Sequence, residues 1–134
     1  MAEPKAGRHK ETLMAQPNPR IKVSTQGNVT IAELVDKKIL DEISIAEISR
    51  QLERLVTAAA APRIVLDFAS VAHMSSSMLG KLITLNKHVR EHQGHMRLCN
   101  VQPAINEVFV ITRLSEVFHV TQTRDQAVAE LEKA

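Results

Sequence analysis

Two short strand-like runs constrain the fold more than any other feature of this chain. These runs are "RIVLDF", residues 63–68, and "HMRLCNV", residues 95–101. The first is an apolar run rich in branched residues, which is typical of a strand covered on both faces, and the second is predicted to be another buried strand. The segment between them has helical periodicity. The pair therefore predicts two parallel strands joined by a helix.

The remaining segments predict further elements around this unit. Residues 20–25 and 29–34 alternate on either side of a Gln-Gly-Asn turn, which indicates a β-hairpin. A helix follows, for which Ser44 and Glu47 have the spacing of a capping box, and residues 58–61 extend or fray it until Pro62 ends it.

Three later elements complete the prediction. Gly94 is expected just beyond the end of the second helix, at the position that glycine favours. Pro103 opens a third, short helix. "VFHVTQT", residues 117–123, is predicted to be a final strand, and Thr123 with Gln126 caps a last helix.

The resulting order, β-β-α-β-α-β-α-β-α, predicts an α/β fold with a mixed, mostly parallel sheet packed against about four helices. The sheet should be centred on Val65 and Leu66. Residues 1–19 carry three prolines and mixed charges without a hydrophobic period, so we expect a disordered leader there and one domain over residues 20–134.

Composition narrows the classes of function. Aromatic residues make up only 2% of the chain and the formal net charge is +2, which argues against nucleic-acid binding through stacked bases. The single cysteine, Cys99, cannot form an internal disulfide and is expected to be a core residue. No apolar run reaches the length of a membrane span. We expect a soluble cytoplasmic protein without a membrane partner.

The segment "HMSSSMLGKLITL", residues 73–85, places three serines before a helical pattern. Ser75 is the predicted N-cap, which puts Ser76 and Ser77 in the first turn, among backbone N–H groups without helical acceptors. A phosphate is compatible with that position because the helix dipole favours an anion there. The alternative is that the serines only cap the start of this helix and have no further function.

The chain resembles the STAS domain of anti-sigma-factor antagonists over about residues 21–131. The resemblance rests on the strand ending in Asp67, the Met-x-Ser-Ser-x-Leu-Gly core at residues 74–80, the "LCNV" strand and "EVFVITRLSEVF". It implies a single STAS-like domain. It also implies that Ser76, or alternatively Ser77, is phosphorylated by a partner kinase. Ser75 stands where the family pattern has an acidic residue, and Met78 where it has glycine.

The same resemblance implies a bacterial binding module, without enzymatic activity or cofactor. It would sequester an anti-sigma factor that has a kinase-type ATPase domain, and a serine phosphatase would reverse the modification. The alternative is a phosphorylation-independent STAS scaffold in a larger regulatory assembly. The residues expected to contact the partner are Asp41, Ser75, Ser76, Ser77, Met78 and Lys81.

Two catalytic interpretations are weaker. "HVREH", residues 88–92, matches the H-x-x-E-H pattern of zinc peptidases. The segment lies in the last turns of a helix, however, so we do not expect His88, His92 or the nearby His95 to hold a required metal. The serine triplet lacks the flanking glycines of a nucleophile elbow. No catalytic residue is therefore predicted, and a serine- or zinc-dependent hydrolase remains a minor alternative.

Overall fold

The computed structural model describes residues 20–134, and the predicted leader, residues 1–19, lies outside the described residues. Four strands form the main sheet in the order β1-β2-β4-β6. β1 (Ile21–Gln26) and β2 (Val29–Leu34) form the antiparallel hairpin. β4 (Arg63–Asp67) and β6 (His95–Cys99) continue the sheet in parallel. The predicted α/β fold with a mixed, mostly parallel sheet is confirmed.

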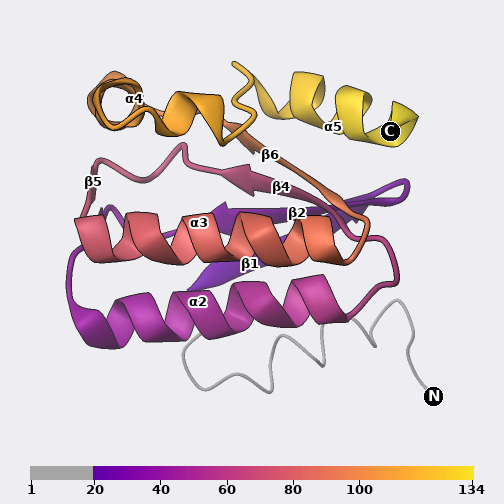
Figure 1. The fold of residues 1–134 in the computed structure, drawn as a ribbon, viewed down its shortest axis with the longest axis horizontal. Coiled ribbons are helices and arrows are strands. Elements are labelled where there is room, and N and C mark those ends of the chain that lie inside the picture. The colour runs from indigo at the N-terminus through magenta and orange to yellow at the C-terminus, as the bar shows by residue number, and fades with distance from the viewer. Residues whose placement is uncertain (1–19) are drawn as a thin grey trace.

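Helices cover both faces of this sheet (Figure 1). α2 (Glu42–Thr57) and α3 (Ser76–Glu91) lie side by side on one face, and α5 (Arg124–Lys133) packs on the other. α4 (Pro103–Ile111) and a 3-10 turn, η1 (Leu114–Glu116), connect β6 to α5. A second, two-stranded sheet pairs β3 (Lys38–Ile39) with β5 (His73–Met74).

Strand periodicity explains why β4 reads as a continuous apolar run. Ile64 and Leu66 point to the α2–α3 side, whereas Val65 belongs to the cluster under α5. Because successive side chains of a strand point to opposite faces, both sets are buried only when both faces are covered. Val65 and Leu66 are fully buried in a strand that has neighbours on both sides, as predicted.

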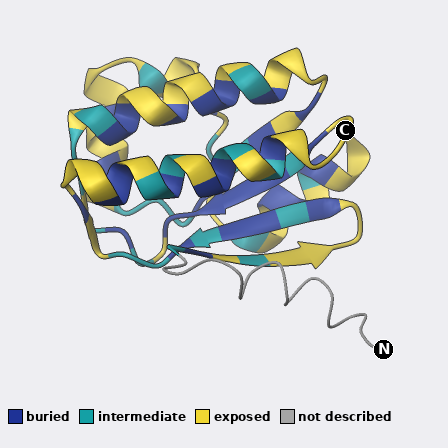
Figure 2. Ribbon diagram, turned by 90° about the horizontal axis from the view of Figure 1, so that it is seen from below, coloured by how far each residue is buried: buried dark blue, intermediate teal, exposed yellow. Residues whose placement is uncertain are grey.

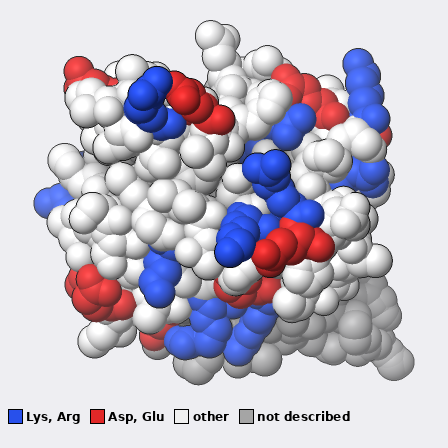
Figure 3. All heavy atoms as spheres, viewed as in Figure 1, with Lys and Arg blue, Asp and Glu red and all other residues white. Residues whose placement is uncertain are grey.

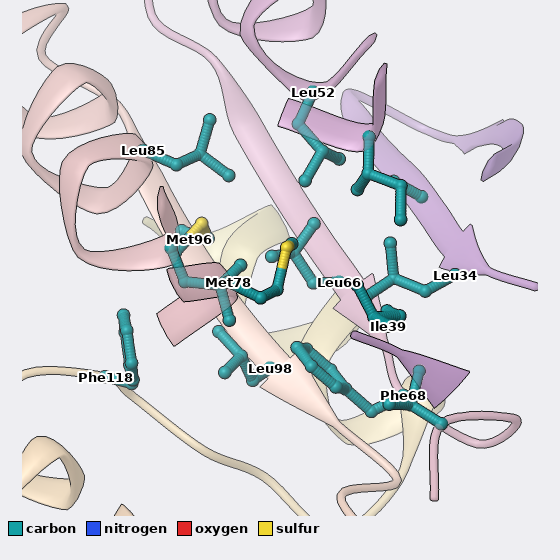
Figure 4. Close-up of a cluster of buried hydrophobic side chains, with 14 of the residues drawn as sticks. Leu34, Ile39, Leu52, Leu66, Phe68, Met78, Leu85, Met96, Leu98 and Phe118 are labelled. Atoms are coloured by element: carbon teal, nitrogen blue, oxygen red, sulfur yellow. The ribbon is translucent and has the colours of Figure 1, made fainter. Parts of the chain in front are cut away.

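The larger core cluster lies between the sheet and the α2–α3 pair. Figure 2 shows both helices buried toward the sheet and exposed on their outer sides. Figure 4 shows how side chains from strands, helices and the later loops meet there; it labels Leu34, Ile39, Leu52, Leu66, Phe68, Met78, Leu85, Met96, Leu98 and Phe118. Two of the three phenylalanines, Phe109 and Phe118, contact each other with ring centroids 5.4 Å apart.

The predicted capping box of the first helix is wrong. The N-cap of α2 is Asp41, whose side chain accepts a hydrogen bond from the N–H of Ser44, and Ser44 itself is buried in the first turn. Glu47 instead pairs with Arg20. The helix ends at Thr57, and the exposed residues 58–61 do not extend it, which leaves the fraying alternative of the prediction.

The predicted last strand forms only an isolated bridge between Val120 and Leu98. Around this bridge the backbone N–H of Thr121 donates to the carbonyl of Leu98 and the N–H of Asn100 donates to that of Gln122. The Thr121 hydroxyl bonds to the carbonyls of Leu98 and Thr123 before α5 begins. The predicted cap of that helix is confirmed, since the Thr123 side chain accepts a hydrogen bond from the N–H of Gln126.

The end of α3 differs from the prediction by one residue. The left-handed position is Gln93, with φ 63°, and Gly94 follows it, donating its N–H to the carbonyl of Val89. This is the hydrogen-bond pattern of a Schellman motif. Position 94 needs glycine for a steric reason instead: a Cβ there would lie 2.2 Å from the carbonyl oxygen of Pro62.

Candidate functional site

The helix dipoles of α2 and α3 point the same way, so their N-termini meet at one end of the molecule (Figure 1). The two-stranded sheet fixes this arrangement, because it pairs the residues just before α2 with those just before α3. The N–H of Ser75 donates to the carbonyl of Ile39 at 3.0 Å, and the N–H of Ala72 donates to the carbonyl of Lys37 at 2.8 Å. The serine segment is therefore held against the start of α2 by backbone hydrogen bonds.

The three serine hydroxyls have different surroundings. Ser75 is the N-cap of α3, as predicted, and its Oγ accepts a hydrogen bond from the N–H of Met78 at 3.4 Å. Ser77 donates its hydroxyl to Glu42 at 3.3 Å. Ser76 is the exposed first residue of the helix, and its hydroxyl makes no hydrogen bond to any residue that the structure describes. Of the three serines, Ser76 therefore has the hydroxyl that is most accessible to another molecule.

Asp41 lies at the neighbouring helix start. Its carboxylate accepts the N–H of Ser44 at 2.9 Å, and this bond is the main cause that lowers the pKa of the Asp41 carboxyl below its ordinary value. Two exposed apolar side chains flank it, Leu40 at 52% and Ile43 at 71% exposure. We call residues 40–43, residues 75–77 and Lys81 the serine surface.

Lys81 lies one turn beyond the serines and is exposed, as expected of a contact residue. It lines a groove of about 160 Å³ between α2 and α3. Met78 also lines this groove. Its side chain is fully buried and points into the core beside Leu66 (Figure 4), because the third position of this helix faces the sheet. The predicted contact of Met78 with a partner stays a prediction.

Leu40, Glu42 and Ile43 join the serine surface although they were not among the predicted contact residues. A signal for Ile43 was present in the sequence. It lies off the apolar stripe that runs through Ile45, Ile48 and Leu52, so its side chain could not be buried against the sheet. The positions of Leu40 and Glu42 depend on the β3–β5 pairing, which two-residue strands do not reveal in a sequence.

The other residues singled out in the sequence have structural partners. Asp67 is buried and accepts hydrogen bonds from the N–H of Ala69, the amide of Asn100 and the guanidinium of Arg124. Cys99 is buried as predicted, and burial raises the pKa of its thiol to about 12, with a smaller contribution from Asp67.

The histidines of the "HVREH" segment are engaged within the chain. Nδ1 of His88 lies 2.8 Å from a carboxylate oxygen of Glu53, and Nδ1 of His92 lies 2.9 Å from the carbonyl oxygen of His88. Residues 20–134 contain no group of three His, Cys, Asp or Glu side chains arranged to hold a metal ion. Nor does any helix in that range have the length and hydropathy needed to cross a membrane.

Comparisons with known proteins agree with this architecture. A solved STAS-domain protein described as an anti-sigma-factor antagonist, from Planctomyces limnophilus, superposes with a TM-score of 0.77 at 24% identity, covering 84% of this chain and 97% of that one. The Bacillus cell fate determinant SpoIIAA in its phosphorylated form superposes with a TM-score of 0.63 at 16% identity, covering 82% and 97%. At these identities the likeness concerns the fold.

Sequence comparison gives one relative of higher identity and one family match. BtrV of Bordetella bronchiseptica, whose name proposes an anti-sigma factor antagonist, is 33% identical over 72 residues. The match spans 54% of this chain and 62% of that relative. A family model described as the STAS domain matches residues 20–127, which is most of the chain. This protein therefore belongs to the STAS domain family.

Proposed function

We propose that this chain is an anti-sigma factor antagonist that acts by binding, and that the serine surface is where its partner docks. The single observation that carries the proposal is the exposed Ser76 hydroxyl at the meeting point of two helix N-termini, next to Leu40 and Ile43. Exposed apolar side chains beside small polar ones are typical of the contact surfaces of proteins. The name of the relative BtrV supports the same class of function.

The proposed partner is an anti-sigma factor with a kinase-type ATPase domain, and Ser76 is the proposed site of phosphorylation. Ser76 is favoured over Ser77 because the Ser77 hydroxyl already donates to Glu42. A phosphate on Ser77 would face that carboxylate, and two negative groups repel each other. A phosphate on Ser76 would instead lie at the first position of a 16-residue helix, where the dipole stabilises an anion.

Phosphorylation would then block binding without unfolding the domain. In the unmodified protein Ser76 is small and neutral, so a partner can pack closely against it. A phosphate carries about −1.5 to −2 charges and would have to lose its water in the same interface. An unpaired buried charge costs several kcal/mol, and about 2.7 kcal/mol already corresponds to a hundredfold in affinity. A separate serine phosphatase would restore the binding form in the cytoplasm of a bacterial cell.

A phosphorylation-independent STAS scaffold is the second candidate, and one observation favours it. The first turn of α3 carries no acidic residue, because the cap position is occupied by Ser75. If a kinase required a carboxylate next to its target, this chain would not offer one from its own helix. The serine surface would then bind a partner permanently within a larger assembly.

The test uses the kinase-type anti-sigma factor encoded nearest to this gene. Its affinity for the wild-type chain is measured by calorimetry and compared with Ser76→Ala and Ser76→Asp. We expect Ser76→Ala to keep the affinity within about threefold and Ser76→Asp to weaken it at least tenfold, that is by about 1.4 kcal/mol or more. Ser24→Asp, on the exposed strand β1, is the matched control and should leave the affinity unchanged.

Incubation with the same kinase and ATP, followed by mass spectrometry, locates the phosphate. Modification of Ser76 supports the switch, and modification of Ser77 alone moves the site by one residue. Tight binding without any modification favours the scaffold. Absence of binding by wild type and Ser76→Ala, with both chains folded, would contradict the proposed function.

A further inference from the structure

A second polar groove lies at the other end of α3, away from the serines. It has a volume of about 400 Å³ and is formed by the last turns of α3, the start of β6 and the loop after η1. Four of its lining residues are basic or can become so: Arg90, His95, Arg97 and His119. The lining contains no carboxylate. Figure 3 shows Lys and Arg, with Asp and Glu beside them, toward the C-terminal end of α3 and few charges over its N-terminal half.

The positive charge of this groove is only partly neutralised from within the chain. Glu130 on α5 accepts a hydrogen bond from Nε of Arg97 at 2.9 Å and lies 3.5 Å from Nε2 of His119. Arg97 also donates through Nη1 to the carbonyl of Met96. Arg90 is exposed and has no ion pair with any residue in the described range 20–134. Glu130 thus pairs with one of the two guanidinium groups and lies near one of the two imidazoles of the groove.

An unpartnered amide also lines the groove. Asn86 on α3 is 9% exposed, and its side-chain amide makes no hydrogen bond to any residue that the structure describes. Its polar atoms reach solvent in the groove, so a ligand that replaces water there has to supply equivalent hydrogen bonds. A bound group with hydrogen-bonding oxygens in the groove would satisfy the Asn86 amide.

The backbone carbonyl groups at the C-terminal end of α3 do not need the basic side chains of the groove as hydrogen-bond donors. The last carbonyls of the helix already accept hydrogen bonds: that of Val89 from the N–H of Gly94 and that of Arg90 from the N–H of Gln93. The carbonyl of His88 accepts one from the N–H of His92. The basic side chains are therefore not needed as caps of the helix.

We propose that this groove binds a phosphate group, with Arg90, Arg97 and Asn86 as its principal donors. A phosphate offers several oxygens around one centre, which suits planar guanidinium groups and an amide arriving from different elements. The groove is large enough for a phosphate attached to a larger molecule, so inorganic phosphate and a nucleoside monophosphate share the relevant chemistry. The site is separated from Ser76 by the length of a 16-residue helix, roughly 24 Å at ~1.5 Å per residue.

The test is a ¹H–¹⁵N NMR titration of residues 1–134 with sodium phosphate, with sodium chloride held at matched ionic strength. We expect saturable shifts of the Asn86 side-chain amide and of backbone amides from Gln93 to Arg97. Arg90→Gln should weaken the apparent affinity about tenfold, as loss of a charge-assisted contact does. Arg50→Gln, which removes an equal charge from an exposed position on α2, should leave it unchanged.

The same titration with adenosine 5′-monophosphate distinguishes the two sources. Tighter binding than phosphate, with added shifts at Val117, indicates a nucleoside phosphate, and equal affinity indicates that the phosphate alone is recognised. Non-saturable shifts spread over all basic residues, or equal effects of Arg90→Gln and Arg50→Gln, would overturn the proposal. Thermal melts without phosphate check that both variants are folded.

Discussion

The helices on the two faces of the main sheet are held in place by different interactions. The face under α2 and α3 is covered by a large cluster of buried aliphatic and aromatic side chains that reaches every strand of the sheet. The face under α5 has a much smaller cluster of seven residues, Val29, Ile31, Val65, Cys99, Ala127, Val128 and Leu131. Beside that cluster, Arg124 of α5 pairs with Asp67 and Glu33.

This difference indicates which parts of the protein are rigid. Apolar burial is strong and non-directional, so α2 and α3 should open only when the whole domain unfolds. A short helix held by a few apolar contacts and one polar network can separate locally at a lower cost. The serine surface belongs to the strongly held face, so its shape should persist in the folded protein.

The largest expected effect comes from matched leucine truncations on the two faces. Leu82 on α3 and Leu131 on α5 are both fully buried. Leu82→Ala should lower the free energy of unfolding by about 3 to 4 kcal/mol. Leu131→Ala should lower it by about 2 kcal/mol, because the small cluster under α5 can collapse around the cavity more easily. Urea unfolding measures both values. Equal losses of unfolding free energy in the two variants would contradict the proposed difference in packing strength between the two faces.

The polar network should have the next largest effect. Asp67→Asn keeps the shape of the side chain but removes the charge that pairs with Arg124, and it should cost about 2 kcal/mol. The value lies below that of a fully buried pair because the Arg124 side chain is 35% exposed. Hydrogen exchange should become faster in α5 while α3 keeps its protection. Arg113→Ala, which breaks the exposed pair with Glu116, is the control and should have little effect.

The cap of α3 should contribute less. Ser75→Ala removes the acceptor for the N–H of Met78 and should cost at most about 1 kcal/mol, since that hydrogen bond is long, at 3.4 Å. Ser75→Asp should restore the cap and recover the stability of the wild type in thermal or urea unfolding. A loss of several kcal/mol in Ser75→Ala would mean that the serine segment has a further structural role.

The smallest expected effect is a dependence on pH at the cap of α2. The pKa of Asp41 is lowered in the folded state, so its contribution to stability is complete above its ordinary pKa of about 4 and is lost as the pH falls through the folded-state value. Asn also caps helices but does not titrate in this range. The unfolding free energy of Asp41→Asn should therefore fall less than that of the wild type between pH 6 and pH 2.5. Parallel curves would show that the lowered pKa has no effect on folding.

Most of the main sheet could be predicted from the sequence because its signals are local. The branched apolar run of β4, the short run of β6, the hairpin turn and the proline at the start of α4 each specify a structure within a few residues. The segment after Phe118 could not be predicted in the same way. Its apolar pattern is that of a strand, but it forms only one bridge to β6 before α5 begins, and the extent of that pairing depends on contacts that exist only in the folded chain.

The candidate site was predicted only in part for a similar reason. Ser75 and Ser76 depend on a helix start, which the sequence displays directly. The burial of Met78 could not be predicted, because it depends on how α3 turns about its axis when it packs on the sheet. The positions of Leu40 and Ile43 beside the serines depend on the pairing of β3 with β5, which joins segments about 35 residues apart in the chain.

The contact between Gly94 and Pro62 has a consequence for the tolerance of the chain to substitution. Neighbouring positions 93 and 94 should behave in opposite ways in a saturation mutagenesis screen. Gln93 already adopts a left-handed conformation, so Gln93→Gly should be accepted and can stabilise the fold. Any side chain at position 94 would meet the Pro62 carbonyl and force the start of β4 away from the start of β6. Libraries built on this scaffold can therefore vary residue 93 but must leave residue 94 as glycine.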